Sequence, residues 1–217
     1  VTMPDSVRHI SAEAFLECSQ LTDVRMPKKL KYIGIGAFRN CRSLREVKLP
    51  DQVLHIGARA FYGCSGLTSV TIPSSVTSIG EYAFYGMDGL SEVSIPDSVT
   101  EIRDFAFGMH YDSAFSIRIP ANATIADYAL HYCDCLTGIW VDEQNPVYSS
   151  DRQGALLNKD QTLLIRVPGA VRGAYYVPET VTRINADAFS SCESLEIVTI
   201  PSTVATIDYY AFVLCDS

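Results

Sequence analysis

The chain has 217 residues, a net charge of −8 and a pI near 4.9, and 47% of its residues are hydrophobic. That apolar content suffices for a packed interior and excludes intrinsic disorder. The negative charge argues against binding nucleic acid or an anionic membrane through bulk charge, and no run of 18 apolar residues predicts a membrane-spanning segment.

The dipeptide Ala-Phe recurs along the chain at a constant spacing. The slot is filled, in chain order, by Ala14-Phe15, Ala37-Phe38, Ala60-Phe61, Ala83-Phe84, Ala106-Phe107, Ala129-Leu130, Ala188-Phe189 and Ala211-Phe212. Five prolines keep the same spacing: Pro4, Pro27, Pro50, Pro73 and Pro96. A fixed period in the twenties is typical of a solenoid, in which each repeat stacks on its neighbours. We therefore predict one solenoid over residues 1–217, with about eight 23-residue repeats.

Each repeat predicts two short extended segments and one tight turn. In the third copy, residues 67–72 carry β-branched side chains, and apolar and polar residues alternate at the end of this stretch. This pattern predicts a short strand. Pro73 ends that strand because proline cannot donate to a β-ladder. Residues 76–80 predict a second extended piece followed by a bend. Residues 60–64 have helical spacing, which suits one helical or 3₁₀ turn.

Stacking would place equivalent residues of successive repeats, or rungs, beside one another. Parallel strands lie about 4.8 Å apart in the hydrogen-bonding direction, so like side chains should form columns. The largest such column is a predicted aromatic spine, made of Phe15, Phe38, Phe61, Phe84 and Phe107.

One slot, four residues after the alanine, holds most of the cysteines. Its members are Cys18, Cys41, Cys64, Cys133, Cys192 and Cys215. Met87 and His110 replace them in two copies, and a cysteine that exchanges with methionine behaves as a buried hydrophobe. A disulfide framework is the alternative, but it needs a paired geometry that stacked cysteines need not supply.

No catalytic residue, metal or cofactor is predicted. The pattern His131-x-Cys133-x-Cys135 superficially resembles a metal cluster, but it lacks the usual second pair of ligands. His9 and His55 share one slot two rungs apart, about 10 Å, which is too far for a single catalytic hydrogen bond. The chain also contains no nucleophile elbow, phosphate loop or calcium loop.

The period breaks between Ala129 and Ala188, which lie more than two periods apart. The residues that remain when one period is subtracted from this gap are extra residues, and we predict that they form an insertion over residues 142–177. Two apolar runs, 154–157 and 162–167, flank the polar residues 158–161, a pattern typical of a β-hairpin. Insertions in solenoids tend to lie on one side of the stack.

The repeats resemble the BspA-like, treponemal-type leucine-rich repeat family. The shared pattern is Leu-x-x-Val-x-Ile-Pro-x-x-Val-x-x-Ile-Gly-x-x-Ala-Phe-x-x-Cys, and Asn145-Pro146-x-Tyr148 with residues 154–160 resembles that family's hairpin module. Asp142, in the proline slot, and the stretch 152–154 depart from the pattern. Together with the elements above, the resemblance implies an α/β repeat solenoid. It would be a right-handed leucine-rich-repeat superhelix with a parallel β-sheet of short strands, short helical or 3₁₀ turns and an inserted β-hairpin.

The resemblance also implies a bacterial protein that is secreted or at the cell surface, and it supplies no catalytic residues. Some members of the family are adhesins. We therefore expect a non-enzymatic module that adheres to a host or cell-surface protein or glycan, host extracellular matrix being one candidate. A passive spacer or stalk in a larger surface protein is the alternative. No signal peptide is visible and both ends lie inside a repeat, so we expect a fragment or a trimmed mature form.

The slots nine and eleven residues after the alanine flank an inward valine and should face outward. Early copies carry polar residues there, whereas later copies carry Trp140, Ile197 on the rung expected next to Trp140, and, in a copy that runs one residue late, Arg118. Exposed aromatic residues and arginine are enriched at binding hot spots. We therefore predict an interaction patch of these three residues, roofed by the insertion with Tyr148. Alternatively, Trp140 packs under the hairpin and anchors it.

Overall fold

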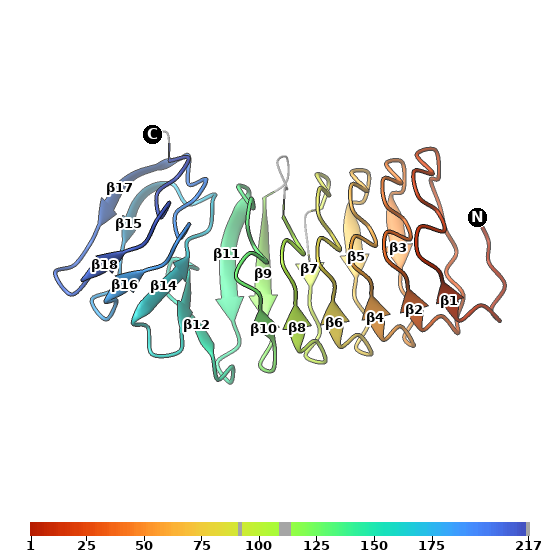
Figure 1. Cartoon of the computed structure of the whole chain (residues 1–217), viewed down its shortest axis with the longest axis horizontal. Helices are drawn as coiled ribbons and strands as arrows, with labels where there is room; N and C mark the ends of the chain where they lie inside the picture. The colour runs from red at the N-terminus through yellow and green to blue at the C-terminus, as the bar shows by residue number, and fades with distance from the viewer. Residues whose placement is uncertain (91–92, 109–113, 216–217) are drawn as a thin grey trace. The chain divides into compact units, whose positions relative to one another are not determined.

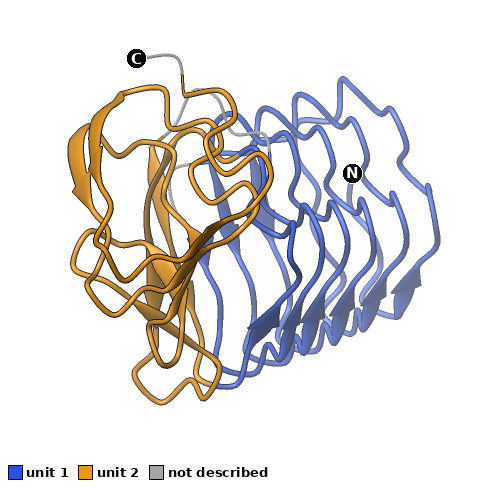
Figure 2. Ribbon diagram, turned by 60° about the vertical axis from the view of Figure 1, so that its left-hand side comes forward, with its two compact units in different colours: residues 1–113, 122–132 blue, residues 114–121, 133–217 orange. Residues whose placement is uncertain are grey.

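The computed structural model describes residues 1–90, 93–108 and 114–215. His110, in the cysteine slot, and position 92, one of the slots expected to face outward, therefore lie outside the described residues. The chain divides into two compact units (Figure 2). Unit 1 is Val1–Ser113 with Asn122–Tyr132, and unit 2 is Ala114–Ala121 with Cys133–Ser217. The single solenoid through residues 1–217 stays a prediction.

Unit 1 is a β-solenoid with two parallel sheets of very short strands (Figure 1). The six-stranded sheet has, in spatial order, β1 (His9–Ile10), β2 (Tyr32–Ile33), β4 (His55–Ile56), β6 (Ser78–Ile79), β8 (Glu101–Ile102) and β10 (Thr124–Ile125). The three-stranded sheet has β3 (Glu46–Lys48), β5 (Ser69–Thr71) and β7 (Val93–Ser94). Partners such as Ile33 and Ile56, or Val47 and Val70, are one period apart, so equivalent residues lie side by side.

The second extended segment of each repeat forms the longer of these two sheets. The glycine that follows it allows the repeats to approach closely. A Cβ at Gly57 would lie 2.8 Å from the backbone of Gly34, and a Cβ at Gly80 would lie 2.6 Å from the backbone of Ala58. At these positions glycine therefore permits close backbone-to-backbone contact between neighbouring repeats.

Unit 2 contains three sheets. The first pairs β9 (Phe115–Ile119) with β11 (Leu136–Val141), and the second pairs β15 (Gly173–Tyr176) with β17 (Leu195–Thr199), both in parallel. The third has, in spatial order, β12 (Tyr148–Ser150), β13 (Leu156–Asn158), β14 (Leu163–Arg166), β16 (Arg183–Ile184) and β18 (Thr206–Ile207).

The predicted hairpin is confirmed by the antiparallel pairing of β13 with β14, and β12 adds a third antiparallel strand. Strand β14 also pairs in parallel with β16, which pairs in parallel with β18. The last strand of the hairpin is thus itself a rung of a parallel sheet. The bounds 142–177 of the insertion stay a prediction.

The predicted helical or 3₁₀ turns, and with them the α/β class, are wrong, because the described residues contain strands and turns but no helix. At most Ala-Phe segments the backbone enters the left-handed region twice, as at Arg59 (φ 56°) and Gly63 (φ 66°), and a right-handed helix cannot continue through such residues. The N–H of Phe61 instead donates to the carbonyl of Ala83 in the next repeat, at 2.9 Å. No described segment therefore forms a helix that could cross a bilayer.

The predicted aromatic spine of unit 1 is confirmed. Neighbouring rings have centroids 5.0–5.7 Å apart and planes within 15° of each other, along the series Phe15, Phe38, Phe61, Phe84 and Phe107. The last four side chains are fully buried. In unit 2, Phe189 stacks on Phe212 at 4.5 Å and meets Tyr175 edge-on at 5.5 Å. Stacked repeats thus supply the core of each unit.

The cysteine slot is a core position in the middle of each stack. All seven cysteines lie within the described residues and are free thiols, and those at 41, 64, 133 and 192 are buried. The thiols of Cys41 and Cys64 donate to the carbonyls of Phe15 and Phe38, at 3.1 and 3.0 Å. Cysteine therefore fills the apolar slot and, through its S–H donor, also ties its repeat to the preceding one.

Replacing Phe61 with alanine should lower the free energy of unfolding by about 3–5 kcal/mol, because it leaves a cavity in the middle of the spine. Chemical denaturation followed by circular dichroism measures this change. Ser69 is exposed on β5, and the Ser69→Ala control should shift stability by less than about 0.5 kcal/mol. A Phe61→Ala protein as stable as the parent would contradict the stacked spine.

Stability should also fall at alkaline pH, because burial raises the pKa of Cys64 from 9.0 to about 12. The folded pKa lies above the unfolded one, so the stabilisation is complete below pH 9 and is lost as pH rises through 12. Urea denaturation of the parent and of Cys64→Ala at several pH values tests this. The stability difference between them should narrow above about pH 9, and a constant difference would refute the assignment.

Candidate functional site

Trp140 lies on β11 with one side against the backbone and 44% of its surface exposed. Its register partner on β9 is Arg118, also exposed. A Cβ at Gly138 would lie 2.7 Å from the indole Nε1, and a Cβ at Gly154 would lie 3.3 Å from Cζ2. The two glycines thus make room for the indole ring. One side of the ring packs on the backbone of the insertion, as an anchor would, and the rest of the ring is exposed to solvent.

Asp142 stands in the slot that other repeats fill with proline, and it organises the exit from β11. Its carboxylate pairs with the guanidinium of Arg118 and accepts a hydrogen bond from the N–H of Gln144 at 2.9 Å. Its own N–H donates to the carbonyl of Ile119 at 2.9 Å. Asp142 therefore fixes the arginine beside Trp140 and starts the turn that follows the strand.

Asn145 is fully buried and holds the next part of the chain in place. Its Nδ2 donates to the carbonyl of Pro120 at 2.8 Å, and its Oδ1 accepts from the N–H groups of Val147 and Tyr148 at 2.9 and 3.0 Å. These partners satisfy the hydrogen-bonding groups of the buried amide, and the amide fixes the start of β12 at Tyr148. This is the physical content of the Asn-Pro-x-Tyr motif.

Asp151 anchors the other end of β12. One carboxylate oxygen accepts from the N–H groups of Gln153 and Ala155, at 2.9 and 2.8 Å, and the other accepts from the hydroxyl of Tyr175 at 2.5 Å. Burial, and then the charge of Asp151, raises the pKa of Tyr175, so its hydroxyl stays protonated and donates. The loop before β13 is thereby tied to β15.

The segment 150–154 lies between β11 and β15. On one side the N–H of Ile139 donates to the carbonyl of Gly154 at 2.8 Å. On the other side the amide of Gln153 donates to the carbonyl of Ala174 at 3.1 Å and accepts from the N–H of Tyr176 at 3.2 Å. A side-chain amide here replaces the main-chain hydrogen bonds that a regular strand would make.

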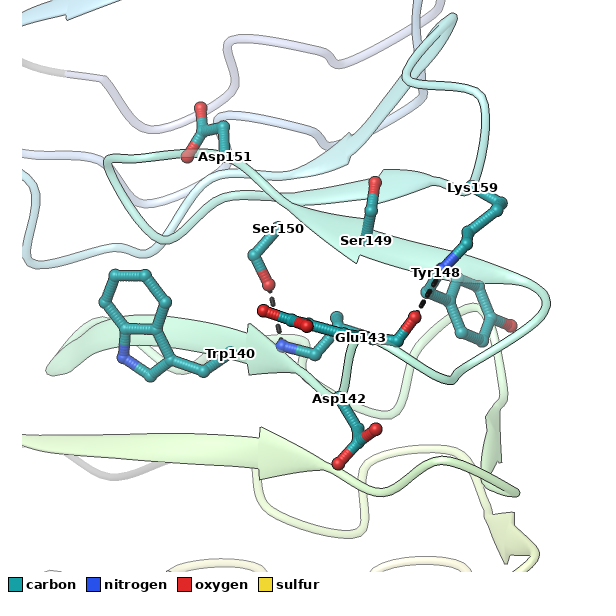
Figure 3. A pocket seen from close by; sticks show the side chains of 9 residues that line it. Trp140, Asp142, Glu143, Tyr148, Ser149, Ser150, Asp151 and Lys159 are labelled. Carbon is teal, nitrogen blue, oxygen red and sulfur yellow. Dashed lines mark hydrogen bonds between the residues drawn. The ribbon is translucent and has the colours of Figure 1, made fainter.

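A pocket with a volume of about 360 Å³ opens beside Trp140 (Figure 3). Its lining residues are Trp140, Val141, Asp142, Glu143, Tyr148, Ser149, Ser150, Asp151 and Lys159. Lys159 donates to the carbonyl of Glu143 at 2.8 Å, and the Oγ of Ser150 accepts from the N–H of Val141 at 2.7 Å. The pocket thus combines aromatic side chains with carboxylates and an ammonium group, which suits a polar ligand with one flat face.

Three of the four predicted patch residues are brought together: Arg118 lies beside Trp140, and Tyr148 lines the same pocket as Trp140. Ile197 is elsewhere. It lies on β17, 59% exposed, opposite Ala174 of β15. The expectation that it occupies the rung next to Trp140 was wrong, because segment 150–154 and β15 intervene.

Two of the histidines, His9 and His55, contribute rings to a stacked column. His9 and His55 lie on either side of Tyr32, with centroids 4.8 and 5.7 Å from it. Burial raises the pKa of Cys133 to about 12, which disfavours the thiolate that metal binding needs. Throughout the described ranges, no group of three or more His, Cys, Asp or Glu side chains is placed to hold a metal ion.

Unit 1 carries an aromatic surface row that sequence reasoning missed. Its stacked ring pairs, with centroids 4.7–5.7 Å apart, are Tyr62–Tyr85, Tyr82–Phe105 and Phe105–Tyr128. The guanidinium group of Arg39 lies over the ring of Tyr62, 5.4 Å from its centroid, and that of Arg59 lies over the ring of Tyr82, 5.0 Å from its centroid. The available signal was the recurrence of aromatic residues one before and two after the slot alanine.

Replacing Tyr175 with phenylalanine should lower the free energy of unfolding by about 1–3 kcal/mol, because it leaves the half-buried Asp151 carboxylate without its donor. Urea denaturation provides the measurement. Tyr176, 63% exposed on the same strand, is the matched control, and Tyr176→Phe should have almost no effect. Equal effects of the two changes would show that the Tyr175–Asp151 bond does not anchor the loop.

The sequence matches a family model described as a BspA type leucine rich repeat region, over residues 54–150 and 174–217 in six copies. A leucine rich cell surface protein from Faecalibacterium prausnitzii A2-165, of known structure, is 34% identical, with a TM-score of 0.82. The match covers 95% of this chain and 56% of that one. No curated protein matched the sequence.

Two further solved structures share the fold. A leucine-rich repeat protein from Eubacterium ventriosum ATCC 27560 is 28% identical over 79% of this chain and 51% of its own, with a TM-score of 0.62. The pneumococcal vaccine antigen PcpA is 21% identical over 99% of this chain and 48% of its own, with a TM-score of 0.63, and at this identity it shows the fold alone. The chain spans about half the length of these three proteins. On this family match and this structural similarity, the chain belongs to the BspA-type leucine-rich repeat family.

Proposed function

We propose that this chain is a non-enzymatic binding module of a bacterial cell-surface or secreted protein, and that a protein or glycan binds at the Trp140 pocket of unit 2. The relative from Faecalibacterium prausnitzii, which is described as a cell surface protein, supports the location. The observation that carries the binding role is a half-exposed tryptophan held beside an arginine at the mouth of a pocket.

The environment of Trp140 supports a role in recognition. Tryptophan and arginine are enriched at binding hot spots, where a ligand removes their remaining exposed surface from water. Gly138 and Gly154 hold the ring against the backbone, and Asp142 holds Arg118, so little side-chain freedom remains to be lost on binding. A preorganised surface of this kind gives affinity without a conformational change.

The pocket hydroxyls support binding rather than catalysis. Ser149 donates to the carbonyl of Asn158 at 2.8 Å, and Ser150 accepts from the N–H of Val141. Within the part of the chain that the structure describes, neither is hydrogen-bonded to a histidine or carboxylate that could act as a general base, as nucleophilic catalysis requires. The carboxylates and Lys159 can instead exchange hydrogen bonds with the hydroxyls of a sugar or the polar groups of a peptide.

A passive spacer is the second candidate, and the outward residues of unit 1 favour it. On β3 and β5 these residues are the exposed Glu46, Lys48, Ser69 and Thr71. A uniformly polar face of this kind is expected where a strand meets only water. The spacer and the binding module differ in whether Trp140 has a ligand.

Replacing Trp140 with alanine should weaken ligand binding by about 30-fold or more, which corresponds to about 2 kcal/mol for a hot-spot side chain. The parent is first screened against immobilised glycans and extracellular matrix proteins, and the variant is then titrated with each ligand found. Trp140 is the only tryptophan, so its fluorescence reports occupancy directly.

The control is Tyr209→Ala, which removes an aromatic residue of unit 2 that is 66% exposed and does not line the pocket. It should bind like the parent. Full binding by a folded Trp140→Ala protein would remove the pocket from the proposal. A parent that binds none of the ligands, with unchanged tryptophan emission, would favour the spacer.

A further inference from the structure

Unit 1 contains a second hollow, which differs in chemistry from the Trp140 pocket. It has a volume of about 630 Å³ and is lined by Thr22, Arg42, Ser43, Arg45, Gly66 and Thr68. These residues belong to three successive repeats, so the hollow extends over three rungs of the stack. Among the described residues, no aromatic or aliphatic side chain lines it, and every lining residue except Gly66 has a side chain that can form hydrogen bonds.

The two guanidinium groups of the hollow are available to a ligand. Arg42 and Arg45 are exposed, and neither side chain has a hydrogen-bond or ion-pair partner within residues 1–90, 93–108 and 114–215. A nearby carboxylate on β3, that of Glu46, is paired with Lys48 at 3.0 Å. Elsewhere in unit 1, by contrast, Arg103 and Arg59 pair with Glu101 and Glu81.

The charge of the chain is unevenly distributed, and the hollow lies largely in the basic part. Residues 1–60 contain ten Lys and Arg against six Asp and Glu, a net charge of +4. Residues 61–217 contain seven against nineteen, a net charge of −12. An anion is therefore attracted to the first repeats and repelled by the rest of the chain, a preference that the overall charge of −8 conceals.

We propose that this hollow binds an anionic glycan through the sulfate or phosphate ester groups on its sugars. A guanidinium presents a planar fork of donors that matches tetrahedral oxyanions, and the Ser43, Thr22 and Thr68 hydroxyls can bond to sugar hydroxyls. A protein partner would need an apolar or aromatic anchor, which this lining lacks. The extent over three rungs suits a chain-like ligand. This site is independent of the Trp140 pocket.

The test uses the whole chain and four probes: a heparin hexasaccharide, the same oligosaccharide desulfated, an oligomeric polyol phosphate and poly-glutamate. Isothermal titration at about 0.15 M ionic strength keeps nonspecific charge attraction small. The parent should bind the sulfated or the phosphorylated probe, and the stronger of the two identifies the ester. The double variant Arg42→Gln with Arg45→Gln should bind it at least about tenfold more weakly, because two charge-assisted contacts are lost.

The matched control is Arg8→Gln with Lys29→Gln, which removes two positive charges from exposed residues of the same basic segment outside the hollow. It should retain binding, and so should Trp140→Ala. Equal weakening by the two double variants would overturn the proposal, because bulk charge would then explain the attraction. Equal binding of desulfated probe or poly-glutamate, or no binding of either ester-bearing probe, would also overturn it. Circular dichroism confirms that each variant is folded.

Discussion

In-register hydrogen bonding between one repeat and the next is the constraint on which each unit depends. In unit 1 the strands pair one period apart, and the turn N–H groups also donate to the neighbouring repeat, as that of Phe38 does to the carbonyl of Ala60 at 2.8 Å. Every slot therefore becomes a column, and an inward column favours side chains that pack on their equivalents in the neighbouring repeats. Phenylalanine rings stack, the recurring glycines allow backbone contact, and cysteine both fills space and donates to a carbonyl.

The same constraint separates stability from function. Inward slots are repeated because each must match its neighbours, whereas outward slots contact mainly solvent and are free to vary. Binding chemistry is therefore expected where outward residues depart from the pattern. The Trp140 pocket lies where Asp142 replaces the slot proline and where the side chains of Asn145 and Asp151 hold an irregular segment by hydrogen bonds.

The two proposed sites use opposite chemistries. In unit 2, an exposed indole lies near the carboxylate of Glu143 and the ammonium of Lys159, which suits a ligand with a flat apolar face and polar edges. In unit 1, the exposed guanidinium groups of Arg42 and Arg45 lie among hydroxyl side chains, which suits an oxyanion. A repeat protein can carry both because each site needs only a few outward side chains on a shared, rigid support.

The period of the repeats by itself determined the stacking, the Phe61 spine and the buried slot of Cys64, because contacts between adjacent repeats recur with the sequence. It also predicted that Arg118 lies beside Trp140. Only the tertiary structure decided the backbone conformation of the turns and which segments lie beside Trp140. The helical spacing of residues 60–64 does not reveal the two left-handed residues that interrupt a helix. Ile197 lies opposite Ala174 of β15, to which Gln153 bonds through a non-repeating contact, and a period carries no information about contacts that occur once.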